Sequence, residues 1–221
     1  MITEEDIIFE DNHILVVNKP ACVPVQLDSS EDESLFEMCK EYIKVKYKKE
    51  GNVYLGMIHR LDRPVSGIIL FAKTSKAAKR LSEELRNKDF KKTYYAIVQG
   101  RLKNSGKLKD YIYRKSATSH ITSNPKKGKE AKLSYKVLWY EDNKTYLKIN
   151  LETGRHHQIR VQFANQNHPL IGDFRYGSKI KFPNKSIALH AGELSFMHPT
   201  KKELLTFKSN PSFYEAYPNL K

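Results

Sequence analysis

The chain has 221 residues, of which 39% are hydrophobic, so it can form one domain with a sizeable core. Its 39 lysines and arginines exceed 25 acidic residues and give a net charge of +14, which indicates nucleic acid or another anionic surface as a partner. Two cysteines are too few for a disulfide framework. No apolar run approaches the roughly 20 residues of a membrane span, and the acidic N-terminus excludes a secretory signal. We therefore expect a cytoplasmic protein that does not bind membranes.

The charge is spread unevenly along the chain. The first 40 residues hold ten acids and two lysines, whereas residues 101–136 hold eleven bases and two acids. Tyr111, Tyr113 and Tyr135 are interleaved with those bases. Basic side chains neutralise phosphates and aromatic rings stack on unpaired bases, so this stretch predicts contact with a nucleic acid. A solvated basic surface is the alternative for the charge, and strand packing is the alternative for each tyrosine.

The first half of the chain alternates β-rich runs with two amphipathic helices. Ser34 and Glu37 have the spacing of a capping box, which predicts a helix that begins beside them. Thr74 or Ser75 is the candidate cap of the second helix. The predicted strands are at 7–9, 14–17, 68–72 and 94–98, and the predicted helices run from 34 to about 46 and from 75 to about 86.

The second half of the chain is richer in strands. Residues 100–130 have weak patterning, with an exposed tip at 125–129. The other predicted strands are at 133–140, 146–151, 187–189, 193–196 and 204–207, and the predicted helices are at 157–165 and 213–217. Strands outnumber helices without regular βαβ alternation, which favours an α+β fold with a mixed, mostly antiparallel central β-sheet flanked by helices and loops. We expect a single domain over residues 1–221.

One carboxylate stands out in the sequence His59-Arg60-Leu61-Asp62-Arg63. Asp62 lies between two arginines and just before an apolar run, and neighbouring cations favour its ionised form. An ionised Asp62 can act as a nucleophile or as a general base. A structural aspartate that caps a turn is the alternative.

A second cluster of polar residues joins a predicted strand to a helix at 153–160. It gathers Arg155, His156, His157, Gln158 and Arg160. Arginines and helix N-termini favour anions, so this segment can hold a phosphate or pair with a carboxylate. A pair of surface arginines is the alternative.

The sequence lacks the usual signatures of metal and nucleotide-cofactor sites. No zinc-ligand spacing, P-loop, G-x-G-x-x-G or G-x-S-x-G motif is present. We therefore expect a site in which a carboxylate acts with cationic side chains, without a metal or a cofactor.

Five ordered segments resemble the RluA-type pseudouridine synthases and together cover nearly the whole chain. They are an opening hairpin at 11–20, the signature H-R-L-D-R-P-V-S-G at 59–67, K-T-Y-Y-A at 92–96, G-R-H-H-Q-I-R at 154–160, and the ending at 189–199. The chain departs from the usual residues at Cys22, Val65 and His156, which leaves every proposed catalytic group in place. The resemblance predicts the pseudouridine synthase fold in a catalytic domain without the N-terminal S4 domain of many relatives.

The resemblance implies isomerisation of uridine to pseudouridine in ribosomal or transfer RNA, without a cofactor. The N1–C1′ bond breaks, the uracil turns, and C5 joins C1′. By similarity, Asp62 attacks C1′ or removes a proton at C2′. Tyr94 stacks on the uracil and helps proton transfer at C5, and Arg160 pairs with Asp62.

Further residues are predicted to bind the substrate. Arg60 would fill the gap that the flipped base leaves in the RNA, and Arg155 and His157 would line the pocket or hold phosphates. Ile187 and Leu189 would form the apolar side of the uracil slot, with plain core packing as the alternative.

The basic stretch at 101–136, including Lys126 and Lys127, would hold the flanking RNA. We expect a monomer without an obligate protein partner. The rival functions are a non-catalytic RNA-binding protein and an RNA hydrolase. Retention of Asp62, Tyr94 and Arg160 together argues against the first rival, and a single aspartate without metal ligands suits the second poorly.

Overall fold

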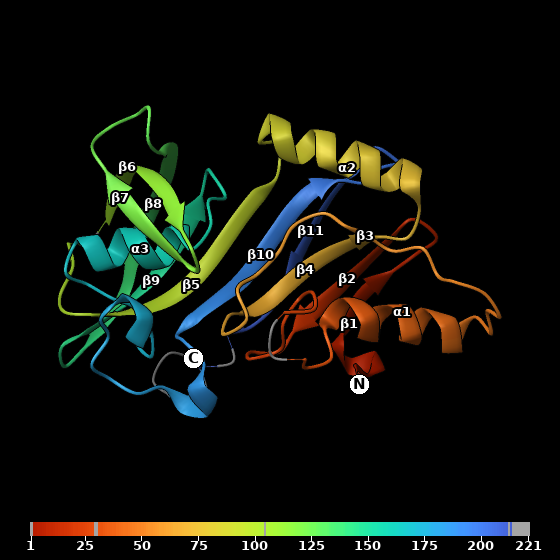
Figure 1. Ribbon diagram of the computed structural model, residues 1–221, viewed down its shortest axis with the longest axis horizontal. Helices are drawn as coiled ribbons and strands as arrows, with labels where there is room; N and C mark the ends of the chain where they lie inside the picture. The colour runs from red at the N-terminus through yellow and green to blue at the C-terminus, as the bar shows by residue number, and fades with distance from the viewer. Residues whose placement is uncertain (1, 29–30, 104, 212, 214–221) are drawn as a thin grey trace. The chain divides into compact units, whose positions relative to one another are not determined.

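The computed structural model describes residues 2–28, 31–103, 105–211 and 213. The chain divides into two compact units. The first unit contains Met1–Phe90 and Glu193–Ser209, and the second contains Lys91–Gly192 and Asn210–Lys221. The chain returns from the second unit to the first within one strand, β10 (Figure 1).

The first unit is a sheet with two helices. Its strands are β1 (Ile7–Glu10), β2 (Ile14–Lys19), β3 (Gly56–Met57), β4 (Ser66–Ala72), the second part of β10 (Leu189–Met197) and β11 (Leu204–Lys208). They lie in the order β1-β2-β4-β10, with β3 beside β4 and β11 beside β10. The helices are α1 (Leu35–Lys46) and α2 (Ser75–Asn87), and a 3-10 turn spans Glu4–Asp6.

Strand β4 is buried on both faces, which explains why its sequence does not alternate. Ile68 and Leu70 join a core cluster with Leu81 of α2. The opposite face of β4 meets α1, where the rings of Phe36 and Phe71 lie 5.9 Å apart. Residues of opposite parity along a strand face opposite sides of a sheet, so the two helices cover opposite faces of β4.

Local caps fix where both helices begin. The Ser34 hydroxyl accepts from the Glu37 backbone N–H at 3.3 Å, and the Thr74 hydroxyl accepts from Ala77 N–H at 3.2 Å. Each contact satisfies a donor that the first helical turn leaves unpaired. The predicted N-termini of α1 and α2 are confirmed.

The second unit is a larger meander of strands with one short helix. Its strands are β5 (Lys91–Gln99), β6 (Ser105–Lys115), β7 (Thr118–Thr122), β8 (Lys129–Glu141), β9 (Lys144–Leu151) and the start of β10. They follow the order β10-β5-β9-β8-β6-β7. Helix α3 (Gln158–Asn165) lies against β6 and β7, and 3-10 turns span Phe174–Tyr176 and Pro183–Lys185.

Most predicted elements are confirmed, and the fold is α+β. One prediction was wrong: of the strand expected at 187–189 only Leu189 is in a strand, and β10 continues from it through His190, Ala191 and Gly192 into the strand expected at 193–196. The small and polar residues in its middle interrupted the β-rich pattern, yet they are buried in the sheet. Strand β3 was not predicted. The helix expected at 213–217 lies outside the described residues, apart from Phe213.

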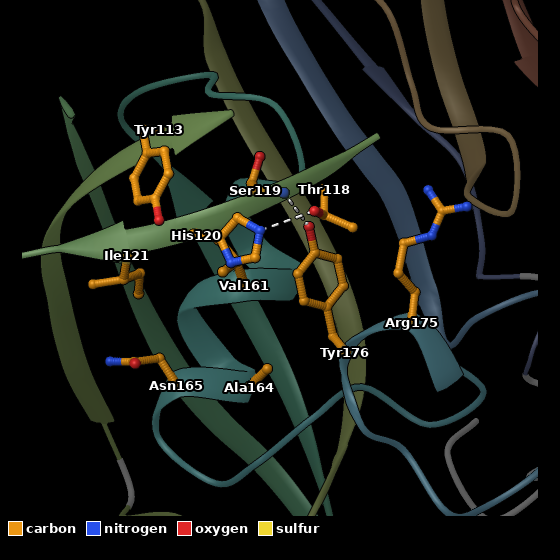
Figure 2. Close-up of a pocket in the computed structure, with 10 residues that line it drawn as sticks. All are labelled: Tyr113, Thr118, Ser119, His120, Ile121, Val161, Ala164, Asn165, Arg175 and Tyr176. Atoms are coloured by element: carbon orange, nitrogen blue, oxygen red, sulfur yellow. Dashed lines mark hydrogen bonds between the residues drawn. The ribbon is translucent and has the colours of Figure 1, made fainter. Parts of the chain in front are cut away.

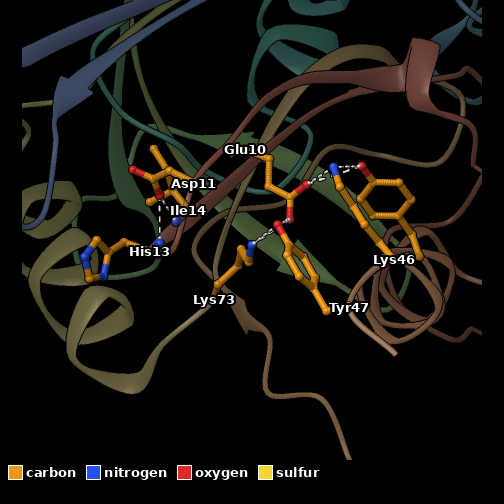
Figure 3. Close-up of polar contacts among 8 residues, drawn as sticks. Glu10, Asp11, His13, Ile14, Lys46, Tyr47 and Lys73 are labelled. Carbon is orange, nitrogen blue, oxygen red and sulfur yellow. Dashed lines mark hydrogen bonds and ion pairs between the residues drawn. The ribbon is translucent and has the colours of Figure 1, made fainter. Parts of the chain in front are cut away.

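A buried carboxylate anchors α1 to the edge of the first unit's sheet (Figure 3). Glu10, at the end of β1, has a side chain only 6% exposed. Its oxygens accept from Lys73 Nζ at 2.6 Å, Lys46 Nζ at 2.8 Å and the Tyr47 hydroxyl at 2.9 Å. Burial would raise the pKa of Glu10, but these hydrogen bonds and the charge of Lys73 lower it to about 2.

The neighbouring Asp11 closes the β1–β2 turn and joins it to the end of β10. One oxygen of Asp11 accepts from the backbone N–H of His13 and Ile14, at 2.7 and 2.9 Å. The other lies 2.8 Å from His198 Nε2. Because His198 Nδ1 accepts from the N–H groups of Thr200 and Lys201, Nε2 carries the proton and donates to Asp11.

Lys19 ends β2 with a fully buried ammonium. Its Nζ donates to the carbonyl oxygens of Pro20 at 2.8 Å, Val23 at 2.7 Å and Arg63 at 3.1 Å. These three acceptors equal the number of protons on an ammonium group. We call this arrangement the Lys19 clasp. It ties the 20–23 turn to the 62–65 turn, which is about 40 residues further along the chain.

Glu10→Gln should destabilise the first unit at neutral pH. The folded pKa of about 2 lies below the ordinary value of 4.5, so ionised Glu10 stabilises the fold above pH 4.5, and this is lost as the pH falls towards 2. Urea unfolding at pH 7 should give a free energy of unfolding about 2–3 kcal/mol lower than that of the wild type. This difference should shrink below pH 4.5. The exposed control Glu41→Gln should show neither effect. Equal pH dependence in the two variants would contradict this role.

Lys19→Met should destabilise the chain by about 3–5 kcal/mol, because three buried carbonyl oxygens lose their donor. The exposed control Lys79→Met on α2 should change the free energy of unfolding by less than about 0.5 kcal/mol. Denaturant unfolding of both variants measures the difference. If the two variants are equally stable, the Lys19 clasp does not hold the turns together.

Candidate active site

Asp62 lies in a turn that leads directly into β4, as the sequence predicted. Its backbone carbonyl accepts from Val65 N–H at 3.0 Å and closes the turn. Asp62 itself is half-buried. Gly67, just beyond, has φ of 117°, a conformation that favours glycine. On the other side, the Nε2 of His59 accepts from Leu70 N–H at 3.1 Å. Asp62 is thus carried on a segment fixed at both ends.

The Lys19 clasp provides a buried cation in this neighbourhood. Burial lowers the pKa of Lys19 to about 7, while the charges of Cys22 and Asp62 act to raise it. The charges of Lys19 and Asp62 therefore attract one another. Sequence reasoning missed Lys19, because a lysine at a strand end usually lies in solvent. The one signal was its place between the apolar run of β2 and Pro20.

The two arginines beside Asp62 have different surroundings. Arg60 is exposed, and its Nη1 donates to the side-chain oxygen of Gln26 at 3.3 Å. Arg63 donates to the carbonyl of Cys22 at 3.2 Å and forms ion pairs with Asp28 and Asp32. Arg63, which the sequence left without a role, thus ties the acidic loop to the 62–65 turn.

Tyr94 is in the second unit, on β5, with only 8% of the residue exposed. It pairs with Ile149 of β9. Lys92, Ala96 and Val98 share its face of β5, because side chains alternate along a strand. The predicted alternation of β5 is confirmed, and both faces of the strand are largely buried.

A buried amide organises the turn at 153–157. The side-chain oxygen of Gln158 accepts from the Thr153 hydroxyl at 2.8 Å and from Arg155 N–H at 3.1 Å. The Gln158 nitrogen donates to the carbonyl of Lys132 at 3.1 Å. His157 stands at the N-cap position of α3 with φ of 53°. Gln158 therefore has a structural role that the sequence did not indicate.

Arg160 forms a buried ion pair within the second unit. Its Nε and Nη2 donate to the two oxygens of Asp173, at 2.7 and 2.9 Å. Arg160 is 4% exposed and Asp173 is 1% exposed. Asp173 thus engages two of the five N–H groups of the guanidinium. Sequence reasoning missed Asp173, whose only signal was a single acid after the apolar pair Leu170-Ile171. The predicted contact of Arg160 with Asp62 stays a prediction.

Both histidines of the 153–160 segment are held by hydrogen bonds. Their rings stack 3.7 Å apart. His157 Nδ1 lies 2.8 Å from the Tyr176 hydroxyl, which also accepts from Ser119 N–H at 2.8 Å. The Ser119 hydroxyl donates to the carbonyl of His156 at 2.6 Å, so His156 Nδ1 donates to that hydroxyl at 2.9 Å. The departure at His156 is thus accommodated by Ser119.

Ser119 and Tyr176 border an open cavity of about 350 Å³ between β7, α3 and the 3-10 turn at 174–176 (Figure 2). The His120 ring points into it from β7, and its Nε2 lies 2.9 Å from the Thr118 hydroxyl. None of the predicted catalytic or pocket residues lines this cavity, whereas Tyr113 of the basic stretch does. His157 and Arg160 both contact Tyr176, which borders the cavity.

The structure distributes the remaining predicted residues of the second unit over three places. Arg155 is half-buried and donates through Nε to the carbonyl of Glu130 at 2.8 Å. Lys126 and Lys127 are exposed on the turn between β7 and β8, where Lys127 Nζ lies 4.3 Å from the centre of the Tyr113 ring. Ile187 and Leu189 are 5% and 4% exposed.

The described residues include neither a metal-binding cluster nor a membrane-crossing helix. Within the described ranges, no group of three or more His, Cys, Asp or Glu side chains is placed to hold a metal ion. In the same part of the chain, no helix has the length and apolar character needed to cross a membrane.

Comparison with known proteins gives consistent matches over most of the chain. The family model of the RNA pseudouridylate synthases matches residues 13–165. The uncharacterized RNA pseudouridine synthase YhcT of Bacillus subtilis is 36% identical over 91% of this chain and 67% of its own length. Ribosomal large subunit pseudouridine synthase D of Vibrio cholerae is 33% identical over 91% and 66%. Synthase C of Buchnera aphidicola is 34% identical over 97% and 70%.

Solved structures support the same fold. Human RNA pseudouridylate synthase domain containing 4 superposes with a TM-score of 0.79 at 20% identity, over 96% of this chain and 90% of its own. Human RNA pseudouridylate synthase domain containing 1 has a TM-score of 0.75 at 23% identity, over 96% and 85%. The chain spans about two thirds of the length of the curated relatives above. It belongs to the RNA pseudouridylate synthase family.

Proposed function

We propose that this chain isomerises uridine to pseudouridine in a structured RNA, with Asp62 as the catalytic carboxylate. The N1–C1′ bond of the nucleotide breaks, the uracil turns, a C5–C1′ bond forms, and the C5 proton leaves while N1 gains one. Product and substrate have the same atoms, so no co-reactant is needed. Asp62 either attacks C1′ or removes a proton at C2′.

The observation that carries this proposal is the fixed turn of Asp62 beside the buried Lys19 ammonium. The charges of Lys19 and Asp62 attract one another, and both chemical routes use a carboxylate at this position. The closed turn and the Lys19 clasp also reduce the motion of Asp62, and positioning of a reacting group accelerates a reaction.

Arg160 and Tyr94 are the proposed partners of Asp62. Asp173 orients the Arg160 guanidinium through two of its five N–H groups, and a guanidinium can serve a second carboxylate with others. Tyr94 would stack on the uracil and assist proton transfer at C5. We include both units in one catalytic domain, because the proposed catalytic residues come from both.

Exposure and charge support the proposed roles of Arg60, Lys126 and Lys127, and the other substrate contacts rest on the resemblance. Arg60 is long, cationic and exposed, which suits a side chain that enters the space left by a flipped base. Arg155 and His157 would line the pocket or hold phosphates, and Ile187 and Leu189 would provide its apolar side. Lys126 and Lys127 would contact flanking RNA.

Ribosomal RNA is the first candidate substrate, because two of the relatives are named as ribosomal large subunit synthases. Transfer RNA is the alternative. We propose that the enzyme works as a cytoplasmic monomer without a cofactor or an obligate protein partner.

Asp62→Asn should abolish pseudouridine formation and leave the fold intact, because the amide has the same shape but cannot supply a carboxylate. Purified protein is added to total RNA from a strain that lacks the gene, and pseudouridines are mapped. The rate should fall by at least roughly 10³-fold, while Asp142→Asn, at the exposed β8–β9 turn, should retain full activity. An active Asp62→Asn enzyme would refute the assignment, and a wild-type protein that binds RNA without modifying it would favour the non-catalytic rival.

Replacing Lys126, Lys127 and Lys129 together by glutamine should reduce the salt dependence of RNA binding. Removing one lysine–phosphate interaction lowers the slope of log K against log[salt] by roughly 0.7 for single strands, so we expect a decrease of up to about 2. The matched control replaces Lys44, Lys48 and Lys49, which are exposed in the first unit, and should leave the slope unchanged. An unchanged slope in the first variant would reject RNA contact at the β7–β8 turn.

A further inference from the structure

Lys92 begins the face of β5 that carries Tyr94, and the proposed mechanism gives it no role. The register pairs Thr93 with Asn150, so the residues after the end of β9 run beside the start of β5. A Cβ placed on Gly154 would lie 3.4 Å from Lys92 Nζ. The ammonium of Lys92 thus sits over the glycine that opens the 154–160 segment.

Lys92 differs from Lys19 and Lys73, whose ammonium groups have partners within the fold. Lys19 has three carbonyl acceptors and Lys73 has Glu10. For Lys92, no carboxylate or hydrogen-bond acceptor is found among the residues that the structure describes, and its pKa is lowered by burial alone. Lys92 is half-buried, so its ammonium is partly removed from water and can still be reached from solvent. Such a charge is well suited to an anion that arrives from outside.

Gly154 leaves the head of Lys92 accessible. It is exposed, and it is not among the glycines with positive φ. Its backbone conformation therefore does not require glycine. What the absence of a side chain provides is room above the ammonium, so that an anionic oxygen can approach both groups closely.

We propose that Lys92 and the backbone at Gly154 bind a phosphate of the RNA strand next to the target uridine. This inference rests on the proposed function, which places the uracil on Tyr94. Two residues of a strand span roughly 7 Å, a spacing on the scale of one nucleotide. An ammonium acts as a point charge for phosphate oxygens. Lys92 would thereby set the register of the strand as the base enters.

Uridine 5′-monophosphate and uridine are the probes, because they differ only in the phosphate. Binding is followed by NMR of the lysine side chains in the intact protein. Wild type should bind the monophosphate more tightly than the nucleoside, and Lys92→Met should lose this preference, by roughly 10- to 100-fold. The matched control is Lys91→Met, the exposed neighbour on the opposite face, which should keep it. An equal preference in Lys92→Met and wild type would overturn the proposal.

A second measurement needs no variant and covers the case in which Lys92→Met does not fold. The Lys92 signal is titrated with pH, with and without uridine 5′-monophosphate. Bound phosphate should raise the pKa of Lys92, because an anion favours the ammonium. A titration that is unchanged at saturating monophosphate would contradict the proposal.

Activity separates this inference from the proposed function. On RNA from the strain that lacks the gene, Lys92→Met should raise KM more than it lowers kcat, and Lys91→Met should change neither. If wild type forms no pseudouridine, the proposed function fails. If wild type is active and Lys92→Met matches Lys91→Met in KM and in monophosphate preference, the phosphate site alone is wrong.

Discussion

The first unit depends on a charge that its own backbone must satisfy. The ammonium of Lys19 is fully buried, and three carbonyl oxygens from two separate turns hold it. Because an unpaired buried charge costs several kcal/mol, both turns must be in place at once. The pairing of Lys19 with Gly67 between β2 and β4 brings them together. The position of Asp62, inside the second turn, is therefore a consequence of the pairing of two core strands.

The same rule shapes the second unit. The Gln158 amide and the Arg160–Asp173 ion pair are buried and satisfied, and they fix the start of α3. Fully satisfied polar groups rigidify a segment, whereas an unsatisfied one is costly. Lys92 contrasts with these groups, since burial alone lowers the pKa of its ammonium and no charged or hydrogen-bonding partner in the described chain acts on it. That contrast, more than its position in a motif, is what suggests a ligand.

Local signals in the sequence predicted the local structure. The caps at Ser34 and Thr74 and the uninterrupted apolar run of β4 each depend on a few adjacent residues. The sequence could not predict that Lys19 binds the carbonyl of Arg63, or that Asp173 orients Arg160, because these partners are distant in the chain and neither partner has a distinctive pattern. The resemblance, rather than the periodicity, identified Tyr94 and Arg160 as candidates, and their contacts with Asp62 are still proposals.

The uneven charge of the chain has a structural explanation for its acidic part, and RNA contact is the proposed explanation for its basic part. Several acids of the first 40 residues form ion pairs within the first unit. Glu10 pairs with Lys46 and Lys73, and Asp28 and Asp32 pair with Arg63. By contrast, Lys126 and Lys127 are exposed at a turn. Salt screens exposed charges far more than buried pairs. Ionic strength should therefore act on RNA binding through the exposed lysines, while pH acts on the fold through Glu10, so the two roles of charge are separable in one molecule.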